Sequence, residues 1–159
     1  MNLFIQIVTP FLGALVGSMI ALSKFKKERM WQEKYNAYQD IINSIEIMNL
    51  WAKDTQCSVA MLPTIGNHDD RERYKEYAQA RRQISKYACI GKLLISDSAR
   101  NKLEKLESEI WDEMSRAEDE NPGDPQKQEF AYGEHAQKTH DIIKKYLPGI
   151  IVLAKVDLK

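Results

Sequence analysis

Residues 3–22 read LFIQIVTPFLGALVGSMIAL, an apolar stretch of twenty residues that contains no charged side chain. At a helical rise of 1.5 Å per residue, such a stretch spans about 30 Å, the thickness of the hydrocarbon core of a bilayer. Core helices of soluble domains seldom run this far without a charge. The stretch therefore predicts a transmembrane helix, which we place at residues 1–23. A buried core helix and a cleaved or interfacial segment are the alternatives.

The charged residues that flank this stretch predict its orientation. Lys24, Lys26, Lys27 and Arg29 follow it closely, whereas no basic side chain precedes it. A secretory signal peptide has the opposite order, with basic residues ahead of the apolar run. Because basic residues favour the cytoplasmic side of a membrane, we expect a single-pass protein of the inner (cell) membrane. Its N-terminus is expected outside, and residues 24–159 are expected to form a cytoplasmic helical domain.

Small residues recur at every fourth position of the apolar stretch. They are Thr9, Gly13, Gly17 and Ala21. In lipid, small side chains let two helix backbones approach closely, and a Gly-x-x-x-Gly pair is a common contact between membrane helices. We therefore expect Gly13, Gly17 and Ala21 to carry the association of membrane helices in a homo-oligomer. The alternative is that glycine is simply frequent in membrane helices.

The charge balance limits the partners of the remaining chain. The 159 residues include 23 Lys and Arg against 23 Asp and Glu, so the net charge of zero does not point to duplex nucleic acid. The distribution is uneven. Residues 71–92 carry seven basic and two acidic side chains (net +5), whereas residues 96–121 carry four basic and nine acidic side chains (net −5). Two such segments can attract each other within one domain.

The stretch after the predicted span indicates a long helix. No Pro or Gly occurs in residues 23–62, so the membrane helix is expected to continue to about Ala52. Apolar residues recur there at steps of three and four, which is typical of a helix in a bundle. They are Trp31, Tyr35, Tyr38, Ile42, Ile45 and Ala52, with Asn49 at the remaining heptad position and with Ile41 and Met48 widening the stripe. Residues 54–68 contain Pro63, Gly66 and Asn67 and are expected to be a connection.

Three further helices complete the expected fold. The second runs from Asp69 to about Ile90, and the third begins at Ser96 or Asp97 and ends before Pro122. The last begins near Gln126 or Gln128, and its tail at 148–159 is either helix or strand. We favour a helix, because no second strand is evident to pair with it. The chain is therefore expected to be mainly α, with one transmembrane helix that continues into the long helix of a cytoplasmic bundle.

The second predicted helix carries the candidate binding site. Its basic and aromatic side chains are Arg73, Tyr74, Tyr77, Arg81, Arg82 and Lys86, and Arg73, Tyr77 and Arg81 follow one another at four-residue spacing. Guanidinium groups and tyrosine rings together suit phosphates and stacked bases. We expect a small anionic ligand here, with a nucleotide as one such ligand. The alternative is a solvated basic face that pairs with the acidic third helix.

Motifs for catalysis and for metal binding are missing from the sequence. His135 and His140 are five residues apart, which is not the spacing that puts two ligands on one helical face. No phosphate-binding glycine loop or nucleophile motif occurs. Cys57 and Cys89 are expected to be reduced and buried. We therefore expect no catalytic activity, no cofactor and no metal.

The layout of the chain resembles that of small bacterial single-span membrane effectors. The resemblance lies in the short span, the juxtamembrane helix that begins W-x-E-K-x-x-A-Y at Trp31, and the small helical domain. It is a resemblance of organisation to antiviral defence proteins, for example the cyclic-oligoadenylate-gated membrane effectors of type III CRISPR systems. It implies a non-enzymatic effector that perturbs or opens the membrane when a ligand binds its cytoplasmic domain. The alternative is a membrane-tethered adaptor for a cytoplasmic protein.

Overall fold

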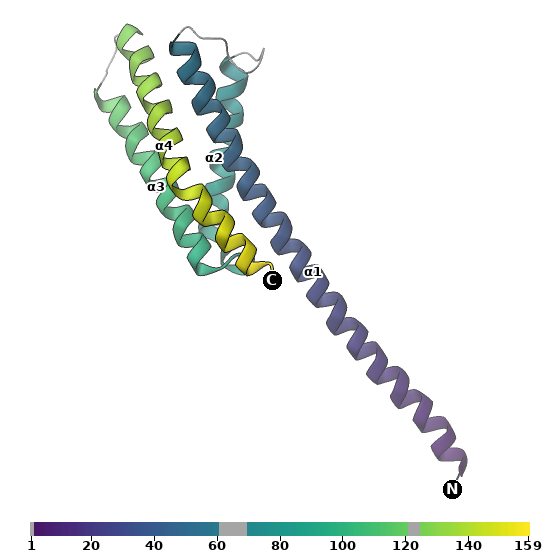
Figure 1. Cartoon of the computed structure of the whole chain (residues 1–159). Coiled ribbons are helices and arrows are strands. Elements are labelled where there is room, and N and C mark those ends of the chain that lie inside the picture. The colour runs from purple at the N-terminus through teal and green to yellow at the C-terminus, as the bar shows by residue number, and fades with distance from the viewer. Residues whose placement is uncertain (1, 61–69, 121–124) are drawn as a thin grey trace.

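The computed structural model is a bundle of four helices, one of which extends far beyond the bundle (Figure 1). The structure describes residues 2–60, 70–120 and 125–159, with side chains for residues 15–58, 60, 71–91, 93–116 and 133–159. The helices are α1 (Asn2–Val59), α2 (Asp70–Ile90), α3 (Asp97–Glu120) and α4 (Pro125–Asp157), with a short 3₁₀ helix η1 (Gly91–Leu93) between α2 and α3. The expected mainly α helical bundle is confirmed.

The four helices pack side by side so that each contacts two others. α1 packs against α2 and α4, and α3 packs against the same two helices. In Figure 1, α1 leaves the bundle beside the C-terminal end of α4 and continues alone toward the N-terminus. The part of α1 within the bundle begins near Ala37, its first buried residue in the described part of the chain.

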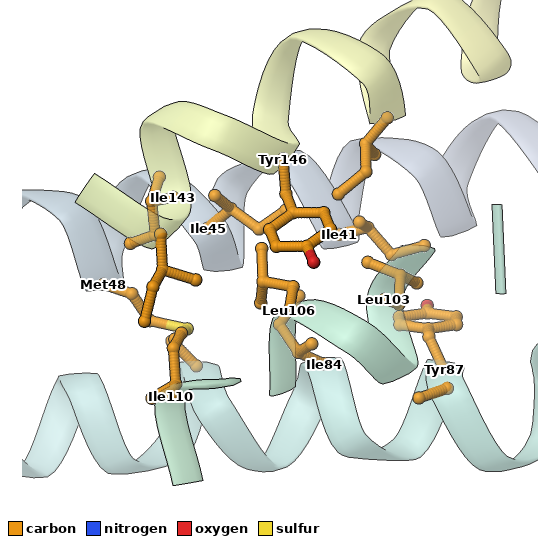
Figure 2. Packing of buried hydrophobic residues seen from close by; sticks show 14 of the residues in the cluster. Ile41, Ile45, Met48, Ile84, Tyr87, Leu103, Leu106, Ile110, Ile143 and Tyr146 are labelled. Atoms are coloured by element: carbon orange, nitrogen blue, oxygen red, sulfur yellow. The ribbon is translucent and has the colours of Figure 1, made fainter. Parts of the chain in front are cut away.

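The core consists of apolar side chains from all four helices (Figure 2). α1 contributes Ile41, Ile45 and Met48, and the most central residues of the other helices are Ile84, Leu103, Leu106, Ile110 and Ile143. Burying one such side chain contributes roughly 1.5–3 kcal/mol to folding. Of the predicted apolar stripe of α1, Tyr38, Ile45 and Ala52 are buried as expected. Its centre, however, lies on Ile41 and Met48, and Trp31 and Tyr35 are exposed.

One predicted helix end differs from the structure, and the favoured helical tail is confirmed. α1 extends to Val59, beyond the expected end near Ala52. Residues 54–59 contain no Pro or Gly to end the helix, and Asp54 lies buried against α2, where it forms an ion pair with Arg73. The tail, which was open between helix and strand, is helical: α4 passes through Pro148 and ends at Asp157. Asp69 and Pro63–Asn67 lie outside the described residues.

Capping and close approach shape the α2–α3 corner and the α3–α4 contact. The Ser96 hydroxyl accepts a hydrogen bond from the Ala99 amide at 3.3 Å and so caps α3, in agreement with the predicted start of this helix at Ser96 or Asp97. A Cβ atom on Gly149 would come within 2.9 Å of the Lys102 side chain. The missing side chain at Gly149 therefore lets Lys102 of α3 lie against α4.

The predicted membrane span is only partly described. Side chains of residues 2–14 lie outside the description, and with them that of Thr9 and the surroundings of Gly13. Searched over the described residues alone, the structure contains no helix that is both long enough and apolar enough to cross a membrane.

Candidate functional site

The six predicted binding residues of α2 do not share one open face. Tyr77 is buried in the core, with 1% of its surface exposed. Arg73 points toward α1, where it lies 3.2 Å from the buried Asp54 carboxylate. Arg81 points toward α3, where its guanidinium lies over the Trp111 ring, 4.7 Å from the ring centre. The two arginines thus flank a core tyrosine and face different neighbouring helices.

The remaining three predicted residues are accessible. Tyr74, Arg82 and Lys86 are all exposed. The Lys86 ammonium group lies 6.0 Å from the ring centre of Tyr87, at the outer limit of a cation–π contact. The structure therefore brings Tyr74 close to Tyr77, and it leaves Arg82 and Lys86 as an accessible basic pair. Whether any of the six binds a ligand stays a prediction.

An aromatic cluster surrounds Tyr77 near the end of the bundle that lies away from the projecting part of α1. Trp51 of α1 stacks on Tyr77 with ring centres 4.0 Å apart, and its ring meets Tyr74 edge-on at 6.5 Å. His135 of α4 lies 5.7 Å from Trp51 and 6.5 Å from Tyr77. Such offset and edge contacts add about 0.5–1.5 kcal/mol per pair beyond the buried area. The cluster therefore joins α1, α2 and α4.

Three polar atoms in and beside this cluster are buried without a hydrogen-bond partner in the described part of the chain. They are the Tyr77 hydroxyl, His135 Nδ1 and the Thr139 hydroxyl. Burial raises the pKa of Tyr77 to about 12. Burial, together with the Arg81 cation and against the opposing effect of Glu113, lowers the pKa of His135 to about 4. At neutral pH, His135 is therefore a neutral part of the core.

A second polar network lies at the opposite end of the bundle, where α1 emerges. The Asp157 carboxylate accepts hydrogen bonds from the Tyr38 hydroxyl and, at 3.0 Å, from the Ser96 amide. The Trp31 indole donates to the Leu158 carbonyl at 2.9 Å. Burial alone would raise the pKa of Asp157, but these donors and the nearby Lys34 hold it below its usual value. The network fixes the end of α4 to α1 and to the α2–α3 corner.

Sequence reasoning missed several members of these two networks. Asp54 lies in the segment that was expected to be a connection. Asp157 lies in the tail for which both helix and strand were considered. The spacing of His135 and Thr139, four residues apart on one helix face, was the signal that could have placed His135 in the core.

Asn49 was expected at a heptad position of the apolar stripe of α1. It is half-buried, and its side-chain oxygen lies 2.7 Å from Nδ1 of His140 within the same chain.

The predicted association residues of α1 have no contact with the bundle where they are described. A Cβ atom on Gly17 would meet nothing within 4 Å, and Ala21 is exposed. Every described side chain from Leu15 to Met30 is likewise exposed. The surface of α1 from Leu15 to Met30 is therefore accessible to a partner other than the described part of this chain.

The described residues hold no group of three or more His, Cys, Asp or Glu side chains that could bind a metal ion. Both cysteines are free thiols, but Cys57 is only half-buried and Cys89 is exposed. The expectation that both are buried is therefore wrong. Cys89 lies near the end of α2, on a face that no described element covers.

Comparisons with protein-family models, with curated proteins and with solved structures give no significant match to this chain.

Proposed function

We propose that the protein is a non-enzymatic membrane-anchored effector that acts by assembling through its first helix. Residues 3–22 cross the cell membrane once with the N-terminus outside, and the four-helix bundle lies in the cytoplasm. The proposal rests on one observation: α1 is a single unbroken helix from Asn2 to Val59, joining the apolar stretch to the core of the bundle. A change in bundle packing is thereby transmitted to the span without an intervening joint.

The exposed surface of the projecting helix supports assembly. Leu15, Val16, Met19 and Ile20 are each more than half exposed, and no other described element covers them. Large apolar side chains in this position need either lipid or another copy of the helix around them. Gly17 and Ala21 lie among them and let a second helix approach closely.

The trigger in this proposal is a small anion, such as a nucleotide, bound at the basic surface of α2. Arg82 and Lys86 are the predicted residues that such a ligand can reach, and they lie one turn apart on α2. Arg73 and Arg81 already have carboxylate and aromatic partners, so they support the ligand site only if binding rearranges them. The ligand therefore meets Arg82 and Lys86 first.

A cross-linking experiment tests the assembly. Single cysteines replace Gly17 or Met19 in a background without Cys57 and Cys89, and membranes are oxidised. Residues 17 and 19 are two positions apart, so their side chains point in directions about 200° apart around the helix axis. Gly17→Cys is therefore expected to form disulfide dimers, and Met19→Cys far fewer. Carbonate extraction of the same membranes reports integration. If neither cysteine variant forms dimers, α1 serves only as a tether. If carbonate extracts the protein from the membranes, residues 3–22 do not span the membrane and the proposal fails.

Ligand binding is tested separately on purified protein. Nucleotides, cyclic ones included, are expected to raise the melting temperature of the wild type and not that of the Arg82→Ala/Lys86→Ala variant. A Lys53→Ala variant, which changes an exposed lysine on α1, is the control for charge. Growth arrest on overexpression, abolished by Gly17→Leu, would link the assembly to membrane damage. No shift with any nucleotide would leave the effector without its trigger.

The second candidate is a membrane-tethered adaptor, favoured by the acidic surface of α3. Glu104 and Asp112 lie exposed on that helix beside the exposed Trp111, so a basic and aromatic partner surface would be complementary to it. A pull-down from native membranes with wild type and with Trp111→Ser separates the candidates. A stable protein partner that is lost with Trp111→Ser, without growth arrest, favours the adaptor.

A further inference from the structure

The end of the bundle from which α1 projects carries apolar side chains that no described element covers. We call Trp31, Ile90, Leu93 and Val156 the proximal surface. Their exposed fractions are 47% for Trp31, 61% for Ile90, 82% for Leu93 and 60% for Val156. The hydrogen bonds of Trp31 with Leu158 and of Ser96 with Asp157 hold α1, the α2–α3 corner and the end of α4 together there. Figure 1 shows these segments at the same end of the bundle.

We propose that the proximal surface docks on the headgroups of the bilayer that α1 enters, with Ile90 and Leu93 inserted among the lipids. This inference rests on the proposed membrane span. It assigns a lipid surface, and not a second copy of the chain, as the partner of this end of the bundle.

The length of α1 between the apolar stretch and the bundle makes the contact geometrically accessible. Trp31 lies nine positions beyond Leu22, which corresponds to about 13 Å of helix. The headgroup region itself extends about 5–7 Å beyond the hydrocarbon core. The corner that carries Ile90 and Leu93 is farther away, because Tyr87 and Ser96 beside it are held level with Asp40 and Tyr38 of α1. A tilt of α1 in the upper part of the usual range, up to about 40°, lowers the side of the bundle toward which it leans and brings this corner to the headgroups. Contact then requires no bend in α1.

The charges around the proximal surface match an anionic membrane. Lys24, Lys26 and Lys27 are exposed on the projecting part of α1, and Lys155 and Lys159 are exposed at the end of α4. Glu28 follows the first group and forms a long ion pair with Lys24 at 3.9 Å. At the α2–α3 corner, the exposed Asp97 forms an ion pair with Arg100 at 3.6 Å. Juxtamembrane lysines are attracted to anionic lipids within a Debye length of the surface, about 8 Å at physiological salt.

A second copy fits this end less well than lipid does. The exposed apolar side chains come from α1, the α2–α3 corner and α4, and they do not form the continuous stripe along one helix that helix pairing needs. The lysines around them would repel the same lysines of a symmetric partner. The bilayer is also the partner that α1 itself brings to this end.

Lipid quenching in proteoliposomes tests the docking with the full chain. A fluorophore is attached to Ser98→Cys, an exposed position beside the corner, in a background with Cys57→Ser and Cys89→Ser. Ser58→Cys, exposed near the other end of the bundle, is the matched probe site. Vesicles contain phosphatidylcholine with or without phosphatidylglycerol, and a headgroup nitroxide lipid is the quencher. Carbonate extraction establishes integration in every sample.

We expect the probe at residue 98 to be quenched several-fold more strongly than the probe at residue 58, and more strongly with phosphatidylglycerol. Ile90→Ser/Leu93→Ser should remove most of this difference, and Leu50→Ser, an exposed apolar position elsewhere on α1, should not. Equal quenching at both sites in integrated protein would overturn the docking and leave the proposed function standing. A signal that depends on protein density and not on the quencher lipid would assign this surface to a second copy and overturn the docking. Loss of integration would overturn both.

Discussion

The residues of α2 show how a polar pattern in a sequence can belong to the interior of a fold. Tyr77 is polar at one end, yet its ring is buried against Trp51 and His135. Arg73 pairs with the Asp54 carboxylate, and the guanidinium of Arg81 lies over the Trp111 ring. The sequence showed the right residue types at a helical spacing, but the partners are on other helices. A single helix pattern cannot reveal them.

The ion pair of Arg73 predicts a large effect on stability. Both members are almost buried, with side-chain exposures of 11% for Arg73 and 5% for Asp54. Removing one partner leaves a buried charge without compensation, which typically costs about 3–5 kcal/mol. Arg73→Met should therefore lower the free energy of unfolding, measured by urea titration in detergent. Arg82→Met, on the exposed side of the same helix, should change it by less than about 0.5 kcal/mol. Similar losses in both variants would contradict the ion pair.

The buried neutral His135 predicts a pH dependence of stability. Its pKa is about 4 in the fold against 6.5 as the ordinary value. Between these two values the unfolded chain binds more protons than the folded chain, so stability falls as the pH decreases from 7 toward 4. At pH 5 the loss from this residue is about 2 kcal/mol. Unfolding curves at pH 7 and pH 5 measure it, and His135→Leu should show a smaller difference between the two. An unchanged difference would assign the effect to other groups.

At the scale of the elements, most helices followed from local chemistry. The presence of α2 and α3, the start of α3 at Ser96 or Asp97 and the favoured helical tail agree with the structure because each depends on neighbours in sequence. The end of α1 was wrong because Asp54 is held by a residue of α2, and a contact between helices is invisible to periodicity. The candidate site was predictable in its residue types and not in its geometry. The aromatic cluster needs three helices to form.

Two glycines in or next to helices predict opposite effects of alanine. Gly149 lies inside α4, where a Cβ atom would meet only the flexible end of Lys102 at 2.9 Å. Gly149→Ala should stabilise the protein by up to about 1 kcal/mol through helix propensity. Gly91→Ala places its Cβ 2.9 Å from Cδ1 and Cγ1 of Ile95, which is buried, and should destabilise the protein. Melting temperatures of the two variants measure this contrast, and equal shifts would exclude it.

At the scale of the whole molecule, the bundle and the projecting helix are separable. Buried residues in the described part of the chain begin at Ala37, and the side-chain contacts of residues 15–30 are with α1 itself. The last contact between the exit of α1 and another helix end is the hydrogen bond from Trp31 to Leu158. Among the residues whose side chains the structure describes, the core therefore contains none from the projecting part of α1.

This separation predicts that a chain of residues 31–159 folds alone. Its far-ultraviolet circular dichroism should show a helical protein, and its unfolding should be cooperative, because all of its core is retained. A chain of residues 39–159 is the informative comparison. It lacks Trp31 and Tyr38, which hold the end of α4, and should melt at a lower temperature. Failure of the longer chain to fold would show that the projecting helix supports the bundle.

The continuity of α1 also makes it a spacer of fixed length. Trp51 lies 29 residues beyond Leu22, so an unbroken helix holds the aromatic cluster about 44 Å farther along its axis than the edge of the apolar stretch. That distance is several Debye lengths, and the charge of a lipid surface is screened out well before it. Molecules that reach Tyr74 and Arg82 would therefore be drawn from the surrounding solution at its bulk composition. The opposite end of the bundle would experience the ions gathered at the membrane.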